Sequence, residues 1–217
     1  MNKNKIIIVG AGFAGLQTAK GLLDPSFDVT IIDKHNYHLF QPLLYQVATA
    51  GLSPADIALP IRNILRSQKN LKVIMDELIG ISPQLNQITT RNNTYFYDFL
   101  ILATGSELSY FGHEQWKNFS YGLKNIEDAT FLRGKILKAF EKAERIKNKK
   151  AIEKLMKFVI IGGGPTGVEM AGAIAELSKK VLTKEFATID TKAAQIILFE
   201  AGANILPTAS HSLSIYA

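Results

Sequence analysis

Short apolar runs, each bounded by glycine or polar residues, mark the predicted strands of this chain. The runs at 6–9 and 158–161 each lead directly into a glycine-rich turn, which is followed by a helix-compatible stretch. Four consecutive apolar residues leading into such a turn are typical of a strand in a parallel sheet that is buried on both faces. The pattern therefore predicts two strand–turn–helix units, one near each end of the chain.

The pattern between and after these units predicts further elements. Pro60 limits a helical stretch at 54–68 and breaks it, and Asn125 is a suitable N-cap for a long helix that starts after it. The remaining segments are a second strand at 28–34, a strand-like stretch at 71–81, two short strands on either side of 91–93, a buried strand at 99–103, a helix at 166–182 and a strand at 194–200.

The two glycine units are an internal repeat. "KIIIVGAGFAGLQTA" (Lys5–Ala19) resembles "KFVIIGGGPTGVEMA" (Lys157–Ala171) at a constant offset (157 − 5 = 152). We expect an α/β protein with domains at 1–112 and 113–217, and with a small antiparallel β element in the first. The second domain has only one β-α-β unit, and two parallel strands are not a stable sheet. We therefore expect it to be incomplete, most simply because the chain is a fragment of a longer one.

Net charge and amino-acid composition argue against several classes of function. The net charge is +6, but the lysines at 133–157 alternate with glutamates, and Ile136, Leu137, Phe140 and Ala143 recur at helical spacing. This predicts a solvated amphipathic helix, and no aromatic platform for nucleic acid accompanies it. The chain has no cysteine, which excludes disulfides, thiolate metal sites and dithiol redox centres; we predict no metal site. No apolar stretch approaches the ~20 residues of a membrane span, so any membrane contact should be peripheral.

The first glycine motif predicts a dinucleotide site. Gly10 would allow the tight turn, Gly12 would let the backbone approach a pyrophosphate, and Gly15 would let helix and strand pack closely. Asp33 ends the next strand, at a short separation from the third glycine (33 − 15 = 18), where a carboxylate can accept ribose hydroxyls. An ordinary strand-end acid is the alternative, and this context argues against it.

The second motif uses Gly162, Gly164 and Gly167, with Glu200 as the strand-end acid. The separation from the third glycine is longer here (200 − 167 = 33), so the link from helix to strand is extended. Ala201 follows and no arginine is near, so nothing would bind a 2′-phosphate. This favours NAD(H) over NADP(H). Two dinucleotide sites in one chain indicate hydride transfer from a nicotinamide to a flavin.

The segment from His38 to Pro54, "HLFQPLLYQVATAGLSP", contains no Asp, Glu, Lys or Arg. A charge-free segment beside a nucleotide motif has two interpretations: core packing, or the wall of a pocket for a flat aromatic cofactor. The residues alone leave both open.

A family resemblance favours the cofactor. "ILATGS" (Ile101–Ser106) resembles the second FAD signature of the two-dinucleotide flavoproteins. "YHLFQPLLYQVATAGLSPADIALPIR" with "GGGPTGVEMAGAIAEL" resembles type II NADH dehydrogenase, the single-subunit NADH:quinone oxidoreductase. The match runs from Lys5 to the C-terminus and implies the N-terminal portion of such an enzyme. It implies a Rossmann-like FAD domain, an incomplete Rossmann-like NADH domain and quinone as electron acceptor.

The resemblance also implies site residues. Glu169 would be the functional acid near the nicotinamide and quinone, although a glutamate there is usually solvated. His38 could instead be a packed loop histidine, and Leu78 plain core. FAD would contact Gly10, Ala11, Gly12, Phe13, Ala14, Gly15, Asp33, Lys34, His38, Gln41, Pro42, Leu78, Thr104, Gly105 and Glu107. NADH would contact Gly162, Gly163, Gly164, Pro165, Thr166, Gly167, Glu200 and Ala201.

Several alternatives remain at this stage. Sulfide:quinone oxidoreductases and disulfide reductases need redox cysteines, which this chain lacks. A ferredoxin-reductase-like flavoprotein needs none and is therefore the second choice. A non-catalytic FAD-binding module comes next, and a basic membrane or nucleic-acid binder last. The resemblance implies a cytoplasmic location on the inner face of the membrane, with contact only through a C-terminal part beyond this chain. A second copy could complete the short sheet, so a homodimer stays open.

Overall fold

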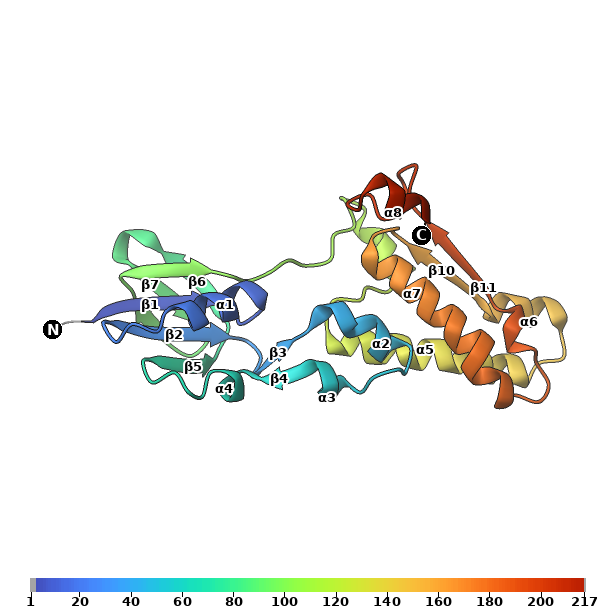
Figure 1. Ribbon diagram of the computed structural model, residues 1–217, viewed down its shortest axis with the longest axis horizontal. Helices are drawn as coiled ribbons and strands as arrows, with labels where there is room; N and C mark the ends of the chain where they lie inside the picture. Colours follow the sequence, from blue (N-terminus) through green and yellow to red (C-terminus); the bar gives the residue numbers. More distant parts are fainter. Residues whose placement is uncertain (1–2, 217) are drawn as a thin grey trace. The chain divides into compact units, whose positions relative to one another are not determined.

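The computed structural model describes residues 3–216, and a parallel sheet organises the first part of the chain (Figure 1). Its strands are β1 (Asn4–Val9), β2 (Phe27–Asp33), β5 (Leu71–Met75) and β9 (Phe99–Leu102), in the order β5-β2-β1-β9. Helix α1 (Phe13–Gly21) connects β1 to β2. This arrangement confirms the predicted α/β class and the first strand–turn–helix unit.

Alternate residues of β1 and β2 point into two different apolar clusters, one on each face of the sheet. Ile6 and Ile8 pack with Leu16 of α1 on one face, whereas Ile7 and Val9 pack with Ile88 on the other. Burial on both faces explains the uninterrupted apolar runs of β1 and β2.

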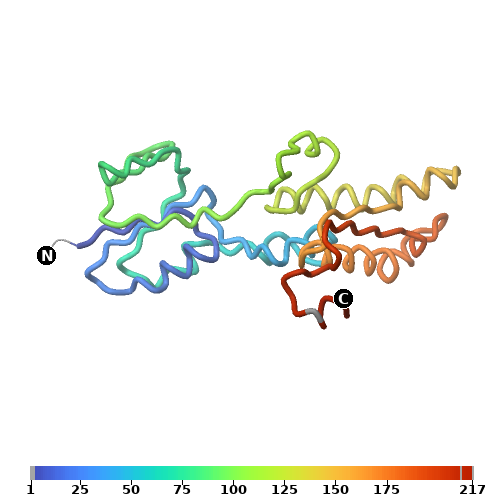
Figure 2. The backbone as a smooth tube through the Cα atoms, turned by 90° about the horizontal axis from the view of Figure 1, so that it is seen from above, coloured from blue at the N-terminus to red at the C-terminus, as the bar shows by residue number. Residues whose placement is uncertain are grey.

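The second face is covered by a small antiparallel sheet, as the sequence predicted. Its strands are β6 (Leu78–Ser82), β7 (Gln87–Thr90) and β8 (Thr94–Phe96), in that order. The stretch predicted as strand at 71–81 is divided between β5 of the parallel sheet and β6 of this one. Figure 2 shows these strands, in green, as a separate layer beside the blue strands of the parallel sheet.

The segment predicted as one broken helix contains a strand. Helices α3 (Pro54–Ile57) and α4 (Ile61–Ile64) flank β4 (Ala58–Pro60), which pairs antiparallel with β3 (Tyr37–Leu39). The break therefore begins before Pro60, because residues 58–60 pair with β3 instead of continuing the helix.

Contact density divides the chain into two compact units. The first runs up to Phe40 and includes Ala55–Ser109; the second comprises Gln41–Pro54 and the chain from Tyr110 onward. The domain boundary near residue 112 stays a prediction.

The second unit is mainly helical. It contains α2 (Leu44–Ala48), α5 (Ile126–Glu144), α6 (Lys149–Leu155), α7 (Pro165–Glu176) and α8 (His211–Tyr216), together with β10 (Lys157–Ile161) and β11 (Gln195–Phe199). Short 3-10 turns occur in this unit at Gln41–Leu43, Glu114–Asn118, Leu182–Lys184 and Thr191–Ala193, and in the first unit at Pro83–Leu85.

The predicted N-cap of α5 is confirmed, whereas the predicted end of α7 is wrong. Asn125 caps α5 as expected: its side chain accepts the Asp128 N–H at 2.7 Å, and the Asp128 carboxylate accepts the Asn125 N–H at 3.3 Å. The helix predicted to run to residue 182 instead ends at Glu176 and continues as a π-helical turn, Leu177–Val181.

Helix α2 comes from the charge-free segment. It packs against α5 and α7 within the second unit, and its residues Leu44, Val47 and Ala48 are buried. The core-packing interpretation therefore accounts for these three residues.

The short sheets leave apolar side chains exposed. Strands β10 and β11 form a two-stranded parallel sheet, on which Val159, Ile161 and Phe199 are exposed. The prediction that the run at 158–161 is buried on both faces is therefore wrong. Strand β9 was predicted to be buried, yet Phe99 and Leu102 are exposed, because β9 is an edge strand of its sheet.

Within residues 3–216, no helix is long and apolar enough to cross a membrane.

Candidate functional site

The first glycine turn joins β1 to α1 and touches the segment after β9. Gly10 has a φ of +100° and its N–H donates to the Ile32 carbonyl at 2.8 Å. A Cβ at Gly10 would overlap the Ala103 carbonyl oxygen and lie 3.2 Å from the Thr104 nitrogen. A side chain at this position is therefore excluded both by backbone conformation and by space, and the turn meets the "ATG" segment directly.

The other two glycines of the turn differ in their surroundings. Gly15 is buried, and a Cβ there would overlap the Gly10 carbonyl oxygen. At Gly12 nothing lies within 4 Å of the Cβ position. Gly15 thus allows close packing, while Gly12 leaves open space at the N-terminus of α1. Backbone N–H groups beside open space at a helix N-terminus fit a pyrophosphate.

Asp33 connects the end of β2 to this turn. One carboxylate oxygen accepts the Ala11 N–H at 2.6 Å, and the other accepts the His35 N–H at 2.7 Å. The side chain is 16% exposed. A carboxylate has about four lone-pair sites, so this one is oriented by the backbone and can still accept ribose hydroxyls.

His38 lies on β3 and reaches the same turn. Its ring is buried, and Nδ1 is 2.9 Å from the Ala11 carbonyl oxygen. The ring of Phe13 packs edge-on against it, with centroids 5.1 Å apart. His38 is therefore a packed histidine, on a strand rather than in a loop, that contacts the glycine motif, and its contact with FAD stays a prediction.

Of the remaining residues predicted to contact FAD, one packs against the core and the others are exposed. Leu78 packs at the edge of the core cluster formed by Ile7, Val9, Ile32 and Ile88. Gln41 and Pro42 are exposed in a 3-10 turn of the second unit. The other exposed members of the set are Phe13, Ala14, Lys34, Thr104, Gly105 and Glu107.

The second glycine turn repeats this geometry. Gly162 has a φ of +106° and its N–H donates to the Phe199 carbonyl at 2.8 Å. A Cβ at Gly167 would overlap the Gly162 carbonyl oxygen, and nothing lies within 4 Å of the Cβ position at Gly164. Pro165 and Thr166 follow as the first residues of α7.

Glu200 follows β11, and its carboxylate also binds the glycine turn. The Gly163 N–H donates to one of its oxygens at 2.5 Å and the Gly202 N–H to the other at 2.9 Å. These backbone donors, Gly202 first, hold the pKa of Glu200 below its ordinary value. A carboxylate kept ionised in this way suits ribose hydroxyls and repels a 2′-phosphate. Ala201 follows and is exposed.

The segment after Glu200 returns to the glycine turn, which sequence reasoning missed. The Leu206 N–H donates to the Gly163 carbonyl at 2.7 Å. A Cβ at Gly163 would lie only 2.9 Å from Ile205 Cγ2. The available signal was the extra glycine at 163, where the first repeat has Ala11.

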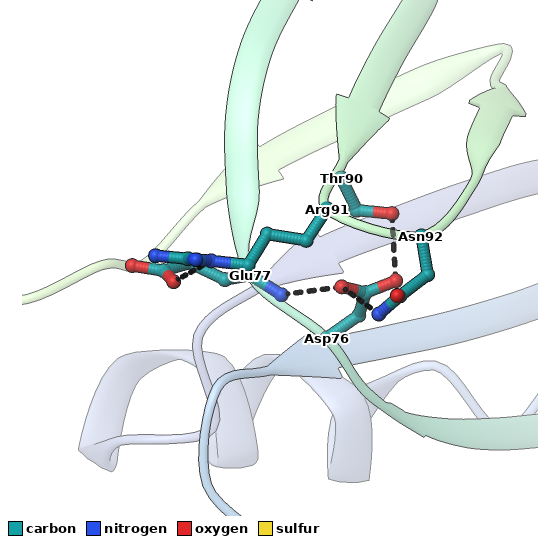
Figure 3. A network of polar contacts seen from close by, with 5 residues as sticks. All are labelled: Asp76, Glu77, Thr90, Arg91 and Asn92. Carbon is teal, nitrogen blue, oxygen red and sulfur yellow. Dashed lines mark hydrogen bonds and ion pairs between the residues drawn. The ribbon is translucent and has the colours of Figure 1, made fainter.

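A polar network at the corner between β5 and β6 was also missed (Figure 3). The buried Asp76 carboxylate accepts hydrogen bonds from the Thr90 hydroxyl at 2.8 Å, the Glu77 N–H at 2.8 Å and the Asn92 amide at 3.0 Å. Burial raises the pKa of Asp76, but these hydrogen bonds outweigh it and leave the pKa lowered. An ion pair between Arg91 and Glu77 lies alongside.

This corner lies close to the first site. The Asp76 N–H donates to the Asp33 carbonyl at 2.9 Å, and Leu78 follows shortly after along the chain. The network therefore holds the backbone of the β5–β6 corner, which lies beside Asp33 and precedes Leu78, the residue expected to flank the adenine.

Glu169 is exposed on α7, and its functional role stays a prediction. Among residues 3–216, no group of three or more His, Asp or Glu side chains is arranged to hold a metal ion.

Comparison with known proteins agrees with this geometry. Two type II NADH:quinone oxidoreductases of Mycobacterium tuberculosis, NdhA and Ndh, are 42% and 44% identical to this chain over 99% and 94% of its length. The chain spans only 47% and 45% of those relatives. A structure of NDH2 from Plasmodium falciparum in complex with NADH is 30% identical with a TM-score of 0.88, covering 99% of this chain and 45% of that one.

These similarities confirm the resemblance to the N-terminal portion of type II NADH:quinone oxidoreductases. The family described as pyridine nucleotide-disulphide oxidoreductase matches residues 4–216. The chain belongs to the pyridine nucleotide-disulphide oxidoreductase family.

Proposed function

We propose that this chain supplies the FAD-binding and NADH-binding portions of an NADH:quinone oxidoreductase. FAD would bind at the first glycine turn, in a domain at 1–112, and NADH at the second, in a domain at 113–217. The bound cofactors would supply the redox chemistry, which is hydride transfer from nicotinamide to flavin and then delivery of two electrons to a quinone.

One observation carries the proposal: both repeats have the same three-part site. Each has a glycine beside open space at a helix N-terminus, a packed third glycine, and a strand-end carboxylate bonded to the turn. The distances from carboxylate oxygen to turn nitrogen are 2.6 Å at Asp33 and 2.5 Å at Glu200. A chain built for a single nucleotide would have no need for the second copy.

The protein's own groups would bind and orient the cofactors. The N–H groups at the starts of α1 and α7 would hold pyrophosphates, and Asp33 and Glu200 would accept ribose hydroxyls. Glu200 would favour NADH over NADPH, because its ionised carboxylate repels a 2′-phosphate.

Glu169 is the proposed acid for proton delivery to the quinone, because it lies just after the third glycine on the helix that begins at the NADH turn. The curated relatives are about twice as long as this chain. The longer protein would complete the quinone pocket and supply a membrane-binding part on the inner face.

Acceptor preference tests the proposal. The chain is loaded with FAD, separated from free flavin, and assayed for NADH oxidation with a soluble short-chain quinone or with a ferredoxin. We expect faster turnover with quinone, and slower quinone turnover for Glu169→Gln than for the exposed control Glu185→Gln.

Each other result has a defined meaning. Faster turnover with ferredoxin would favour a ferredoxin-reductase-like enzyme. Flavin retention without NADH oxidation would leave a binding module, and loss of all flavin would overturn the proposal. Equal quinone turnover in Glu169→Gln and Glu185→Gln would remove the proposed role of Glu169.

A further inference from the structure

Ala11 is held at both of its backbone polar groups by side chains that are distant in sequence. Asp33 accepts the N–H of Ala11 at 2.6 Å, and the ring of His38 lies 2.9 Å from its carbonyl oxygen. A carbonyl oxygen can only accept, so Nδ1 of His38 carries the proton and donates. The His38 ring is therefore fixed as the tautomer with hydrogen on Nδ1, or as the cation.

The Ala11 carbonyl and the Gly12 N–H belong to one planar trans peptide group. Fixing the direction of the carbonyl therefore fixes the N–H, which points the opposite way. Gly12 is the N-cap residue of α1, and nothing lies within 4 Å of its Cβ position. A hydrogen bond from His38 on one side of this peptide thus orients a donor on the other side.

His38 is itself held rigidly. It pairs with Leu59 in the β3–β4 ladder, and the Phe40 N–H next to β3 donates to the Ile57 carbonyl at 2.8 Å. The residue is 8% exposed, with Phe13 packed edge-on against its ring. A ring with so little freedom loses little entropy when it makes the hydrogen bond.

We propose that His38 is a positioning residue that acts through the Ala11–Gly12 peptide to orient the Gly12 N–H toward the pyrophosphate of FAD. This inference rests on the proposed function of the first unit. It assigns His38 a role through the backbone of the glycine turn rather than through contact with the flavin ring.

The test compares FAD affinity among variants of the chain. His38→Phe keeps an aromatic ring beside Phe13 but has no donor, whereas His38→Asn keeps a donor on a short side chain. The matched control Ile61→Val trims a fully buried side chain of the same unit and removes no hydrogen bond from the turn. FAD dissociation constants come from flavin fluorescence, and melting temperatures are measured without FAD.

We expect His38→Phe to weaken FAD binding about threefold to tenfold, the effect of losing one hydrogen bond. His38→Asn should recover most of that loss. Ile61→Val should lower the melting temperature without changing the FAD dissociation constant. A purely structural role for His38 would make FAD affinity follow melting temperature across all three variants, and would overturn the inference.

A second measurement separates this inference from the proposed function. In the ¹⁵N-labelled chain without FAD, we expect the His38 Nδ1 resonance of a protonated nitrogen and a shift of the Gly12 amide in His38→Phe. An unprotonated Nδ1 or an unmoved Gly12 amide would overturn the inference even if FAD binds. A parent chain that binds no FAD would overturn the proposed function, whatever the state of His38.

Discussion

The carboxylate of Glu200 accepts the backbone N–H of Gly163 at 2.5 Å. Asp33 and Ala11 make the same contact at 2.6 Å in the first repeat, and Gly163 follows Ala11 by the repeat offset (163 − 11 = 152). The acid lies farther along the chain from the third glycine in the second repeat (200 − 167 = 33) than in the first (33 − 15 = 18). The geometry of the turn is unchanged by this longer link between helix and strand.

Glu200→Gln should weaken NADH binding by about tenfold and relax discrimination against NADPH, because the amide neither attracts ribose hydroxyls as strongly nor repels a 2′-phosphate. Titration with each coenzyme measures both dissociation constants. The exposed Glu185→Gln is the matched control. An unchanged ratio of NADH to NADPH affinity would remove Glu200 from the coenzyme site.

The longer link of the second repeat is held by Glu144, at the end of α5. Its carboxylate accepts the backbone N–H groups of Ala187, Thr188 and Ile189 at 3.0–3.2 Å. Burial raises the pKa of Glu144, but the hydrogen bonds from Thr188, Ala187 and Ile189 outweigh it and leave the pKa below its ordinary value of 4.5.

The pKa of Glu144 is lower in the folded chain than in the unfolded chain. Ionised Glu144 therefore stabilises the fold above about pH 4.5, and this stabilisation is lost as the pH falls through the folded-state pKa. Glu144→Gln should therefore reduce stability at neutral pH and flatten its dependence on pH below 4.5. Urea unfolding at a series of pH values measures this. A pH profile parallel to that of the parent would contradict the role of Glu144.

Gly12→Ala and Gly15→Ala should separate binding from folding. Gly12 has φ −69° and ψ −163°, which alanine adopts freely, and its Cβ position is open. Gly12→Ala should fold normally but bind FAD about tenfold more weakly, since a methyl group blocks the pyrophosphate. Gly15→Ala should cost about 1–3 kcal/mol of folding free energy, because its Cβ overlaps the Gly10 carbonyl.

Melting temperature and FAD affinity of the two variants decide this prediction. The pair Gly164→Ala and Gly167→Ala repeats the test for NADH in the second unit. Unchanged FAD affinity in a well-folded Gly12→Ala would place the pyrophosphate elsewhere.

The Asp76 network should stabilise the corner beside the first site. Thr90→Val removes the hydroxyl that donates to Asp76 at 2.8 Å and keeps the shape of the side chain. We expect the melting temperature to fall by a few degrees, about 2–4 °C per kcal/mol in a chain of this size. Thr94→Val, at the exposed start of β8, is the control and should change little.

Helices and strands whose formation depends on the local sequence pattern were predictable from the sequence. Apolar runs ending in glycine predicted β1 and β10, and Asn125 predicted the start of α5. The sequence could not show that residues 58–60 pair with β3, because that pairing depends on a partner strand that is distant along the chain. Nor could it show that α7 changes to a π turn at Leu177, where the Thr191 hydroxyl bonds the Ser178 carbonyl at 2.7 Å.

The same distinction applies to the site. Glycine spacing and strand-end acids predicted the two turns, because their chemistry lies within short motifs. The hydrogen bond from His38 to Ala11 and the return of Leu206 to Gly163 depend on tertiary folding, and no local pattern encodes them. In the charge-free segment, Leu44, Val47 and Ala48 form core, whereas the cofactor contacts of Gln41 and Pro42 stay predictions.

The most direct test of the central claim is the visible absorbance spectrum of the FAD-loaded chain before and after anaerobic addition of NADH. Two working dinucleotide sites predict flavin bands that survive gel filtration and are bleached by stoichiometric NADH. A yellow protein that NADH does not bleach, or a colourless one, would contradict the claim that this chain assembles both sites.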